Sequence, residues 1–446
     1  MTCPLPERKF NSIWPAATRV AAFLFALVLV VAITQPVDAQ SFRVLYNFTG
    51  GADGRTPSSG VLLAEDGSLY GNTLGGAGSS GHCSGGQGSV CGTVFQLSNT
   101  GAGWTLTTLY SFAGGTDGAG PQGMTFAPDG SLYGITVAGG IAENLCSGYF
   151  PFLGCGTVYK LTPGSDGTWM KSVLYRFQSQ PLDGWYPIGP PVLDSAGNVY
   201  GTTAASLNQC GQSGYCGTAY RLTRSGRGWT ESAFLQVPGF GPSNLVIDAA
   251  GNLYGTTWNG GPLQDNSPAV YNDGVGVAYK LTPPPSGWNA TLLHNFNLRL
   301  QSCSGESPSG GLIFDRQGNL YGVTVYGGAD NAGTAFELSP EGGNWLCQTL
   351  YSFQGQDTLG GVGSLVMDSA GNLYGVRDAY SGNYGTVFRL THTSDGWIYT
   401  ALHEFNNPDD GEYVPGALTL DGNGSIYGTA RLGGAYGYGV IWEITP

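Results

Sequence analysis

One five-residue stretch, Gly-Asn-Leu-Tyr-Gly, constrains the fold of this chain more than any other feature. It occurs unchanged at 251–255, 318–322 and 371–375, and four near copies bring the total to seven, at intervals of 53 to 67 residues. A unit that recurs at such a period indicates an array of stacked repeats. The tyrosines of the seven copies are Tyr70, Tyr133, Tyr200, Tyr254, Tyr321, Tyr374 and Tyr427.

The composition agrees with a folded array and excludes several other classes. Glycine accounts for 76 of the 446 residues, well above ordinary usage, but the chain lacks the Gly-X-Y period of collagen. Aromatic residues make up 12% of the chain, which argues against disorder. Only 11% of the residues are charged and the net charge is -13, so nucleic acid, which needs clustered Lys and Arg, is not expected as a partner.

The first 39 residues have the features of a secretory signal peptide. Arg8, Lys9 and Arg19 precede an apolar run at 20–33, and a small-residue cleavage site lies at 37–39. The run is short for a membrane span, although an uncleaved anchor is the alternative. We therefore expect a mature single domain, 40–446, that is exported to an extracellular or periplasmic location and has no membrane span.

Each repeat predicts four short antiparallel strands. In the first repeat, apolar or alternating runs lie at 60–64, 68–73, 92–98 and 104–112, separated by turn residues and without a helical period. Four such strands per repeat are typical of a β-propeller blade. The sequence therefore predicts an all-β protein, a seven-bladed β-propeller.

Six tryptophans mark the fourth strands of the repeats. Each lies eight residues before the apolar residue that ends the strand, and this even spacing puts both on one face of the strand. We expect them to pack in the core between adjacent blades rather than to bind a ligand. They are Trp104, Trp169, Trp229, Trp288, Trp345 and Trp397.

The last blade is expected to combine both ends of the mature chain. Residues 42–48 match the fourth-strand pattern of 106–112, whereas the chain ends in a third-strand pattern at 439–445. The N-terminal strand 42–48 should therefore close the last blade. This pairing would remove two open sheet edges.

Eight of the nine cysteines lie outside the predicted signal peptide, an even number in a chain that is expected to be exported. Three pairs occupy the loop between the second and third strands of the first three blades, where a hairpin mouth permits a disulfide. Metal ligation is the weaker alternative, because the spacings differ from those of zinc sites and no histidine clusters with the cysteines. The predicted pairs are Cys83 with Cys91, Cys146 with Cys155, Cys210 with Cys216 and, by elimination, Cys303 with Cys347.

The repeat unit resembles the GloVer tandem repeat of exported bacterial proteins. The resemblance is carried by Leu-Tyr-Ser-Phe at 109–112, Gly-Gly-Thr-Asp-Gly at 114–118, Gly-Asn-Leu-Tyr-Gly-Thr-Thr at 251–257 and Gly-Thr-Val-Phe-Arg-Leu-Thr at 385–391. It covers essentially all of 42–446. It implies a propeller-like repeat protein, with no established activity.

Binding residues are expected where the repeats differ. The loops between the second and third strands are long in the first four blades and would share one face with the inter-blade loops. Aromatic residues gather there and would suit a sugar or peptide ligand, or else pack the loops themselves. The candidate ligand-binding residues are Trp185, Tyr186, Trp258, Tyr271, Tyr149, Tyr215, Asp117 and Asp183.

Acidic residues recur in six of the seven inter-blade loops. A ring of carboxylates could hold Ca²⁺, the one cofactor the sequence suggests. Repeated Asp-Gly turns explain the same residues without an ion, and we favour this interpretation. The acids are Asp53, Asp117, Asp183, Glu306, Asp357 and Asp410.

No catalytic constellation is predicted, because the sequence implies neither a Ser-His-Asp arrangement nor a nucleophile elbow. The favoured hypothesis is a secreted binding or interaction module that takes an extracellular glycan or protein on its long-loop face. One alternative is an extracellular polysaccharide lyase or hydrolase that uses carboxylates at the channel mouth. The other is a structural component of the envelope or matrix without a defined site.

Overall fold

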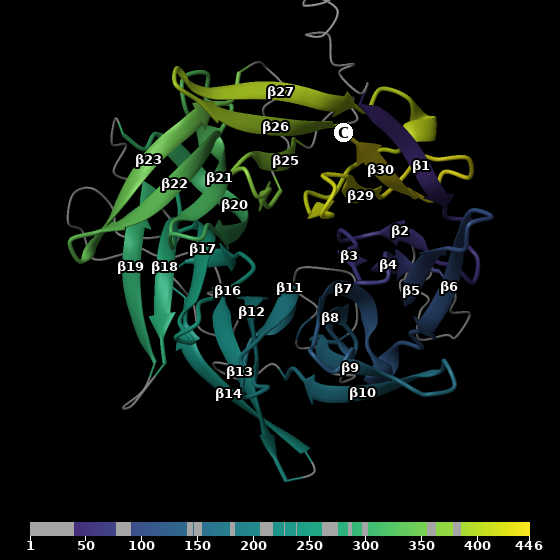
Figure 1. Cartoon of the computed structure of the whole chain (residues 1–446). Helices are drawn as coiled ribbons and strands as arrows, with labels where there is room; N and C mark the ends of the chain where they lie inside the picture. Colours follow the sequence, from purple (N-terminus) through teal and green to yellow (C-terminus); the bar gives the residue numbers. More distant parts are fainter. Residues whose placement is uncertain are drawn as a thin grey trace, which may run out of the picture. The chain divides into compact units, whose positions relative to one another are not determined.

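The computed structural model describes residues 40–76, 91–140, 146, 154–178, 183–205, 217–226, 228–237, 239–260, 275–283, 288–296, 302–354, 363–377 and 385–446. Residues 1–39, the predicted signal peptide, lie outside this set. The compact unit Phe42–Thr445 consists of seven antiparallel sheets and is the predicted seven-bladed β-propeller (Figure 1). No helix in the described residues is long and apolar enough to cross a membrane.

The blades follow one another along the chain, and each is numbered here by its order. Blade 1 holds β2 (Arg55–Pro57), β3 (Leu62–Leu63), β4 (Leu69–Gly75), β5 (Thr93–Asn99) and β6 (Trp104–Ser111). Blade 2 holds β7 (Ala119–Phe126), β8 (Leu132–Ala138), β9 (Thr157–Pro163) and β10 (Trp169–Arg176). Blade 3 holds β11 (Trp185–Leu193), β12 (Val199–Ala205), β13 (Thr218–Ser225) and β14 (Gly228–Gln236).

The remaining blades repeat this order. Blade 4 holds β15 (Phe240–Pro242), β16 (Val246–Ile247), β17 (Leu253–Asn259), β18 (Val277–Thr282) and β19 (Asn289–Asn295). Blade 5 holds β20 (Gly305–Phe314), β21 (Leu320–Gly327), β22 (Thr334–Glu341) and β23 (Asn344–Ser352). Blade 6 holds β24 (Val366–Met367), β25 (Leu373–Arg377), β26 (Thr386–Thr393) and β27 (Gly396–Glu404), and blade 7 holds β28 (Thr419–Leu420), β29 (Ile426–Ala430), β30 (Val440–Thr445) and β1 (Ser41–Asn47). Two three-residue 3-10 turns, Gly115–Asp117 and Pro408–Asp410, lie in inter-blade loops.

The predicted closure of the ring is confirmed. The last sheet has the order β1-β30-β29-β28, so the N-terminal strand lies beside the last strand of the chain (Figure 1). Arg43 on β1 donates from Nε to the Glu443 carboxylate on β30 at 2.5 Å. This pairing protects the edge that β30 would otherwise leave open.

In blades 1 to 5 the innermost strand begins earlier than the run at 60–64 of the first repeat predicts. In blade 1 the expected run at 60–64 is only β3, and β2 precedes it, with Arg55 paired to Gly75 and Pro57 paired to Thr73 of β4. Blade 4 has the same division into β15 and β16. The inter-blade loop therefore contributes directly to the inner wall, a point that matters for the site described below.

The Gly-Asn-Leu-Tyr-Gly stretch is explained by the hairpin that it completes. In blade 3, Asp194 accepts hydrogen bonds from the backbone N–H and side-chain amide of Asn198 and from the hydroxyl of Tyr200, at 2.7 to 2.9 Å. Burial raises the pKa of Asp194, but these hydrogen bonds outweigh it and hold the pKa below its usual value. The first glycine, Gly197, has a φ of 78°, which a residue with a Cβ rarely adopts.

The last glycine of the stretch is required by packing. In all seven copies a Cβ at this position would lie less than 3.0 Å from an aromatic ring of the third strand, such as Phe95 above Gly71 or Trp442 above Gly428. Burying a ring this close to the backbone fills the interior of the blade to native density. The repeat is therefore a structural signature throughout.

The six strand tryptophans pack between adjacent blades, as predicted. Ring centroids are 6.1 Å apart for Tyr70 and Trp169, 5.8 Å for Tyr200 and Trp288, and 6.0 Å for Tyr254 and Trp345. Trp104, Trp229 and Trp397 pack against the clusters that hold Tyr427, Tyr133 and Tyr321. Each tryptophan thus covers the motif tyrosine of the preceding blade and contributes to the apolar seam between them.

Candidate binding site at the channel mouth

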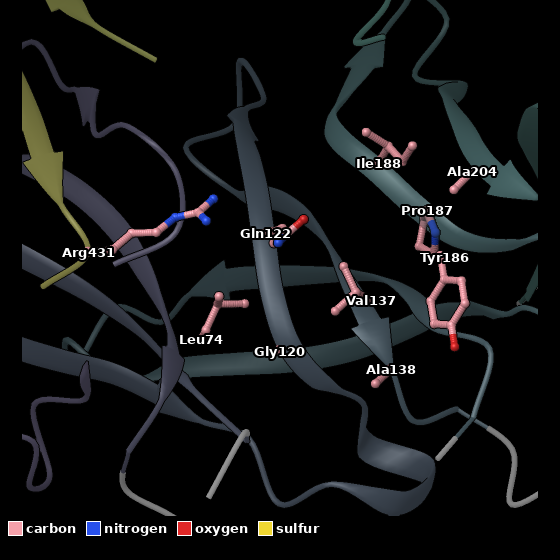
Figure 2. Close-up of a pocket in the computed structure, with 10 residues that line it drawn as sticks. All are labelled: Leu74, Gly120, Gln122, Val137, Ala138, Tyr186, Pro187, Ile188, Ala204 and Arg431. Atoms are coloured by element: carbon pink, nitrogen blue, oxygen red, sulfur yellow. The ribbon is translucent and has the colours of Figure 1, made fainter. Parts of the chain in front are cut away.

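A cavity of about 450 Å³ lies at one end of the central channel. Its walls come from blades 1, 2, 3 and 7, where second strands end and first strands begin. Figure 2 shows Arg431 and Ile188 on opposite sides with Gln122 between them. The volume is within the ~300–1,000 Å³ of ordinary ligand pockets. The lining residues are Leu74, Gly120, Gln122, Val137, Ala138, Tyr186, Pro187, Ile188, Ala204 and Arg431.

Four of these lining residues occupy one position of the repeat. Leu74, Val137 and Ala204 each follow a threonine that pairs with a threonine of the third strand, as Thr73 does with Thr93. Arg431 has the same place after β29 in blade 7. The position therefore recurs around the channel mouth, and the cavity lies beside its copies in blades 7, 1, 2 and 3.

A second repeat position shapes the wall nearest blade 3. Gly120 and Tyr186 are the second residues of β7 and β11, the first strands of their blades, and have φ values of 62° and 56°. Their backbone N–H groups donate to the preceding blade, Gly120 to the Cys91 carbonyl at 3.3 Å and Tyr186 to the Cys155 carbonyl at 3.0 Å. Because Gly120 has no side chain where blade 3 carries a tyrosine, space remains for the cavity.

Residues in the left-handed backbone conformation, with positive φ, recur at the position of Gly120 and Tyr186 in other blades. Thr56, Tyr186, Ser307 and Tyr413 have φ values of 54° to 56°, a conformation that costs a residue with a Cβ about 1 kcal/mol or more. The hydroxyl of Tyr186 also donates to the Cys146 carbonyl at 2.6 Å. The loops at the channel mouth are therefore held in a defined, strained conformation.

Blade 7 carries several exposed apolar and aromatic side chains, which the sequence did not predict. Of the eight large side chains of this kind that are exposed in the described residues, four lie in blade 7 and are called the blade 7 patch: Tyr413, Leu432, Tyr436 and Tyr438. The backbone N–H of Arg431 donates to the Tyr413 carbonyl at 3.1 Å, which places Tyr413 beside this lining residue of the cavity. Exposed tyrosines in such a cluster are typical of a binding surface.

The structure separates the residues that the sequence grouped as ligand-binding. Tyr186 lines the cavity, whereas Trp185 is only 4% exposed and packs in the core between blades 2 and 3. Trp258 is half-buried and has in blade 4 the repeat position that Ala204 has in blade 3. The centroids of the Trp258 and Tyr326 side-chain rings are 6.3 Å apart. The predictions for Tyr149, Tyr215 and Tyr271 lie outside the described residues.

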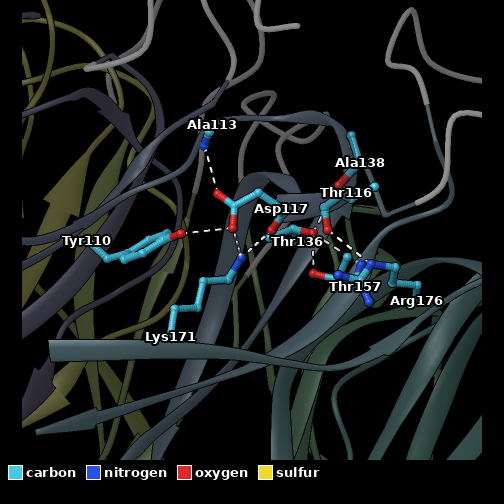
Figure 3. Close-up of polar contacts among 9 residues, drawn as sticks. All are labelled: Tyr110, Ala113, Thr116, Asp117, Thr136, Ala138, Thr157, Lys171 and Arg176. Carbon is cyan, nitrogen blue, oxygen red and sulfur yellow. Dashed lines mark hydrogen bonds and ion pairs between the residues drawn. The ribbon is translucent and has the colours of Figure 1, made fainter. Parts of the chain in front are cut away.

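Asp117 belongs to the interface between blades 1 and 2. Its carboxylate accepts from the Tyr110 hydroxyl at 2.8 Å, the Ala113 backbone N–H at 2.8 Å and Lys171 Nζ at 2.7 Å (Figure 3). Lys171 is only 3% exposed and its ammonium lies 4.5 Å from the centroid of Phe112. Burial lowers the pKa of Lys171, although Asp117 opposes the shift.

Asp183 belongs to the corresponding interface between blades 2 and 3. It accepts from the Tyr175 hydroxyl at 2.9 Å and from the Gln178 backbone N–H at 2.5 Å. Burial raises the pKa of Asp183 to about 6 despite these bonds. Burial, together with the charge of Asp183, also raises the pKa of Glu231 to about 8, and Oε1 of Glu231 has no hydrogen-bond partner in the described residues.

The inter-blade acids are acceptors within their own loops where the structure describes them. Asp53 accepts from Tyr46 and Thr49, as Asp117 and Asp183 do from their tyrosines. Asp410 lies 3.7 Å from Nε2 of His403, which stands at the tyrosine position in blade 6. These bonds support the turn interpretation for Asp53, Asp117 and Asp183.

One member of the predicted acid ring was assigned to the wrong position. Glu306 pairs with Tyr326 in the register in which Arg55 pairs with Gly75, so it matches Arg55 rather than Asp53. Ser304 has the acidic position in blade 5, because Gly305 packs on the threonine pair as Gly54 does. Asp357 lies outside the described residues, and Ca²⁺ binding by the ring stays a prediction.

Two of the four predicted cysteine pairs lie in the described residues, and both are disulfides. Cys146 is joined to Cys155 and Cys303 to Cys347, with Cα atoms 5.3 and 5.5 Å apart. Cys91 is disulfide-bonded as well, while its expected partner Cys83 lies outside the described residues, as do Cys210 and Cys216. The expectation that no histidine clusters with the cysteines was wrong: His294 lies beside Cys303 and Cys347, brought there from another blade.

The chain matches the sequence model of a known repeat family. The model of the Gloeobacter/Verrucomicrobia repeat matches residues 83–272 and 269–446. The chain belongs to this family. The GloVer resemblance is thereby confirmed, and no curated protein matches the chain.

Solved structures that are similar to this chain share little sequence with it. They include a candidate 6-phosphogluconolactonase from Bacteroides uniformis, with 13% identity over 84% of this chain and 90% of that chain and a TM-score of 0.49. A gluconolactonase from Xanthomonas campestris has 14% identity over 73% of this chain and 85% of that chain, with a TM-score of 0.37. A luciferin-regenerating enzyme has 13% identity over 73% of this chain and 91% of that chain, with a TM-score of 0.41.

Proposed function

We propose that this member of the Gloeobacter/Verrucomicrobia repeat family is an exported binding module that holds an apolar segment of an extracellular protein at the channel mouth. The observation that carries the proposal is the cavity, whose lining residue Arg431 is hydrogen-bonded to Tyr413 of the exposed blade 7 patch Tyr413, Leu432, Tyr436 and Tyr438. A pocket that receives an anchoring side chain, bordered by aromatic contact area, is the usual arrangement of a protein-binding site.

The lining of the cavity favours a protein segment over a glycan. Leu74, Val137 and Ile188 present apolar surface, and Gln122 and Arg431 supply the polar side chains. The Tyr186 hydroxyl already donates to a backbone carbonyl. A sugar exposes hydroxyl groups over most of its surface and would lose hydrogen bonds to water there. An apolar side chain would instead match the lining.

Export is part of the proposal and rests on two features. Buried disulfides, such as Cys146–Cys155 and Cys303–Cys347, form and persist in oxidising compartments. The N-terminal pattern at 1–39 is that of a signal peptide. Edman sequencing of the exported protein should give an N-terminus near Gln40, and an intact Met1 on protein retained in the cell would contradict export.

The binding proposal is tested with two variants and two arrays. Ala204→Trp places in blade 3 the residue that blade 4 carries at the same ring position, Trp258, and should fill the cavity. Tyr436→Ala removes the most exposed ring of the patch, 61% exposed, without touching the core. Binding to an array of extended peptides should fall at least about tenfold in the first variant and several-fold in the second.

The control and the contrary outcomes are defined by the same arrays. Ile398→Ser changes a side chain that is 53% exposed on β27, the fourth strand of blade 6. Blade 6 contributes no residue to the described lining of the cavity, so peptide binding should not change. Peptide binding that both site variants retain in full would contradict the proposal. Binding to a glycan array alone would replace the protein ligand with a sugar.

The enzyme alternative, a lyase or hydrolase that uses Asp117 and Asp183, has less support. Both carboxylates accept two or more hydrogen bonds within blade interfaces, and neither lines the cavity. The described lining residues include no carboxylate, histidine or cysteine to act as acid, base or nucleophile. Turnover of an extracellular polysaccharide that Asp117→Asn and Asp183→Asn abolish would favour the enzyme.

A further inference from the structure

Each blade interface repeats a set of three positions. The first is the tyrosine of the fourth strand, as Tyr110 in blade 1, and the second lies in the loop that follows. The third is two residues after the strand tryptophan of the next blade, as Lys171, which pairs with Leu161 of β9. Cys347 pairs with Leu338 of β22 in the same register, so it has the place of Lys171 at the interface between blades 4 and 5.

At the interface between blades 4 and 5, the three positions carry a histidine and two cysteines. His294 replaces the tyrosine, and its pairing with Ala278 matches that of Tyr110 with Val94. Cys303 comes from the loop between the blades. One potential ligand atom from each of His294, Cys303 and Cys347 lies within 4.8 Å of the others, the only such group in the part of the chain that the structure describes.

The three side chains are buried and the imidazole is incompletely satisfied. Their exposed fractions are 7%, 1% and 3% for His294, Cys303 and Cys347. Nε2 of His294 has no hydrogen-bond partner in the described residues, which is rare for a buried polar atom. Neutral imidazole binds metals through such a ring nitrogen.

We propose that His294, Cys303 and Cys347 form a metal site for a thiophilic d10 cation, Zn²⁺ or Cu⁺, when the two cysteines are in the dithiol state. Thiolate and imidazole ligands select these ions over harder ones. Three protein ligands complete a trigonal site for Cu⁺ and leave one tetrahedral position of Zn²⁺ to water. The disulfide and the metal then compete for the same two sulfurs.

The exchange between the two states balances with a small thiol as reductant. Two thiol molecules reduce the Cys303–Cys347 bond, become one disulfide and leave two protonated cysteines. Binding of Zn²⁺ then releases both thiol protons and uses the neutral imidazole as it stands. A chain that meets metal before it is oxidised would reach the metal-bound state without the reduction step.

The interface between blades 6 and 7 supplies a natural control. His403 stands at the same strand position as His294, but its ring stacks on Phe42 with centroids 3.8 Å apart, and Asp410 is its acidic neighbour. A change at His403 therefore alters an equivalent histidine without altering a sulfur-containing site.

The test measures metal binding by the reduced full-length mature chain. The protein is held in a small thiol and titrated with Zn²⁺, and separately with Cu⁺, against a chromophoric chelator. Wild type should bind one more equivalent of metal than the double variant Cys303→Ser/Cys347→Ser. His294→Tyr restores the tyrosine that most blades carry at this position, and it should lower the metal affinity of this site at least about tenfold. His403→Tyr should bind as wild type does, and the oxidised protein should lack this equivalent.

Differential alkylation gives a second readout that does not depend on how well a variant folds. Wild-type chain refolded with Zn²⁺ should protect Cys303 and Cys347 from alkylation relative to chain refolded with chelator, and peptide mass spectrometry locates the protected residues. Loss of this protection in His294→Tyr supports the site. Equal metal affinity of wild type and His294→Tyr, or equal alkylation of all cysteines with and without metal, would overturn it.

Discussion

Two neighbouring interfaces of the propeller are built on the same frame and carry opposite charges. Between blades 1 and 2, the position two residues after the strand tryptophan is Lys171, which forms an ion pair with Asp117. Between blades 2 and 3, the same position is Glu231, which pairs with Leu222 in the register in which Lys171 pairs with Leu161. One interface therefore joins an acid to a base, and the other confines two acids.

The difference shows what the repeat requires and what it leaves open. The tyrosine and the loop acid are present at both interfaces, as Tyr110 with Asp117 and Tyr175 with Asp183. The third position only has to fill the seam, and around the ring it is a leucine, lysine, glutamate, alanine, cysteine or tyrosine. Backbone register is thus fixed by the repeat, whereas the charge within each seam is set by one residue.

The largest effect is expected at the interface between blades 1 and 2. Lys171→Met should lower the free energy of unfolding by about 3 kcal/mol, because it removes one partner of a buried ion pair and leaves the other partly desolvated. Urea denaturation at pH 7 measures the change. Lys160→Met is the control: Lys160 pairs with Asp129, which is 58% exposed, and such surface pairs contribute about 0–1 kcal/mol. Equal effects of the two variants would contradict the buried ion pair.

The interface between blades 2 and 3 should respond in the opposite direction. Because the pKa of Glu231 is raised to about 8 in the folded protein, its contribution to stability is present below pH ~4.5 and is lost as the pH rises through 8. Glu231→Gln should therefore stabilise the protein by about 2 kcal/mol at pH 9, a value reduced for solvent screening of a partly exposed group. At pH 4 the variant should match wild type. Thermal unfolding at both pH values measures this, and a variant that is less stable at pH 9 would refute it.

The sequence predicts the architecture because the features that determine it are repeated seven times. Blade number follows from the motif tyrosines, and closure follows from the fourth-strand pattern at 42–48, which the order β1-β30 confirms. The tryptophan seam is equally regular, since one spacing recurs in six blades. Each of these depends on local pattern, and repetition averages out the irregularities of any single copy.

The candidate site could not be predicted in the same way, because it depends on alignment between blades. Glu306 is predicted from the sequence to be one of the inter-blade acids, whereas the strand register puts it two positions beyond the place of Asp53. Trp185 is predicted to bind ligand, yet its position is that of Ala119 in blade 2, and there it is buried. Aligning residues by register rather than by nearby motif would have found the ring position of Leu74 and Arg431.

The buried charges between the blades could not be predicted from the sequence pattern either. Lys171 and Glu231 lie in strands with an alternating pattern that marks them only as members of one face. Their burial and their partners depend on residues far away in the sequence, as with Lys171 and Asp117, which are 54 residues apart. Long-range packing of this kind is decided by the closed ring, so sequence spacing alone contains no signal for it.

The smallest effect separates the two tyrosines of the compared interfaces. Tyr175→Phe removes the hydroxyl that donates to Asp183 at 2.9 Å, and it should cost about 1 kcal/mol at pH 8. Since the pKa of Asp183 is raised to about 6, its carboxyl is protonated at pH 5, where a neutral acceptor makes a weaker hydrogen bond and the cost should fall to about half. Tyr110→Phe is the comparison variant: it removes the hydroxyl that donates to Asp117, which Lys171 also contacts, and should cost about 1 kcal/mol. Denaturation curves at pH 5, 6, 7 and 8 measure both variants: a cost of Tyr175→Phe that rises through pH 6 supports the raised pKa of Asp183, and a cost that stays the same from pH 5 to pH 8 contradicts it.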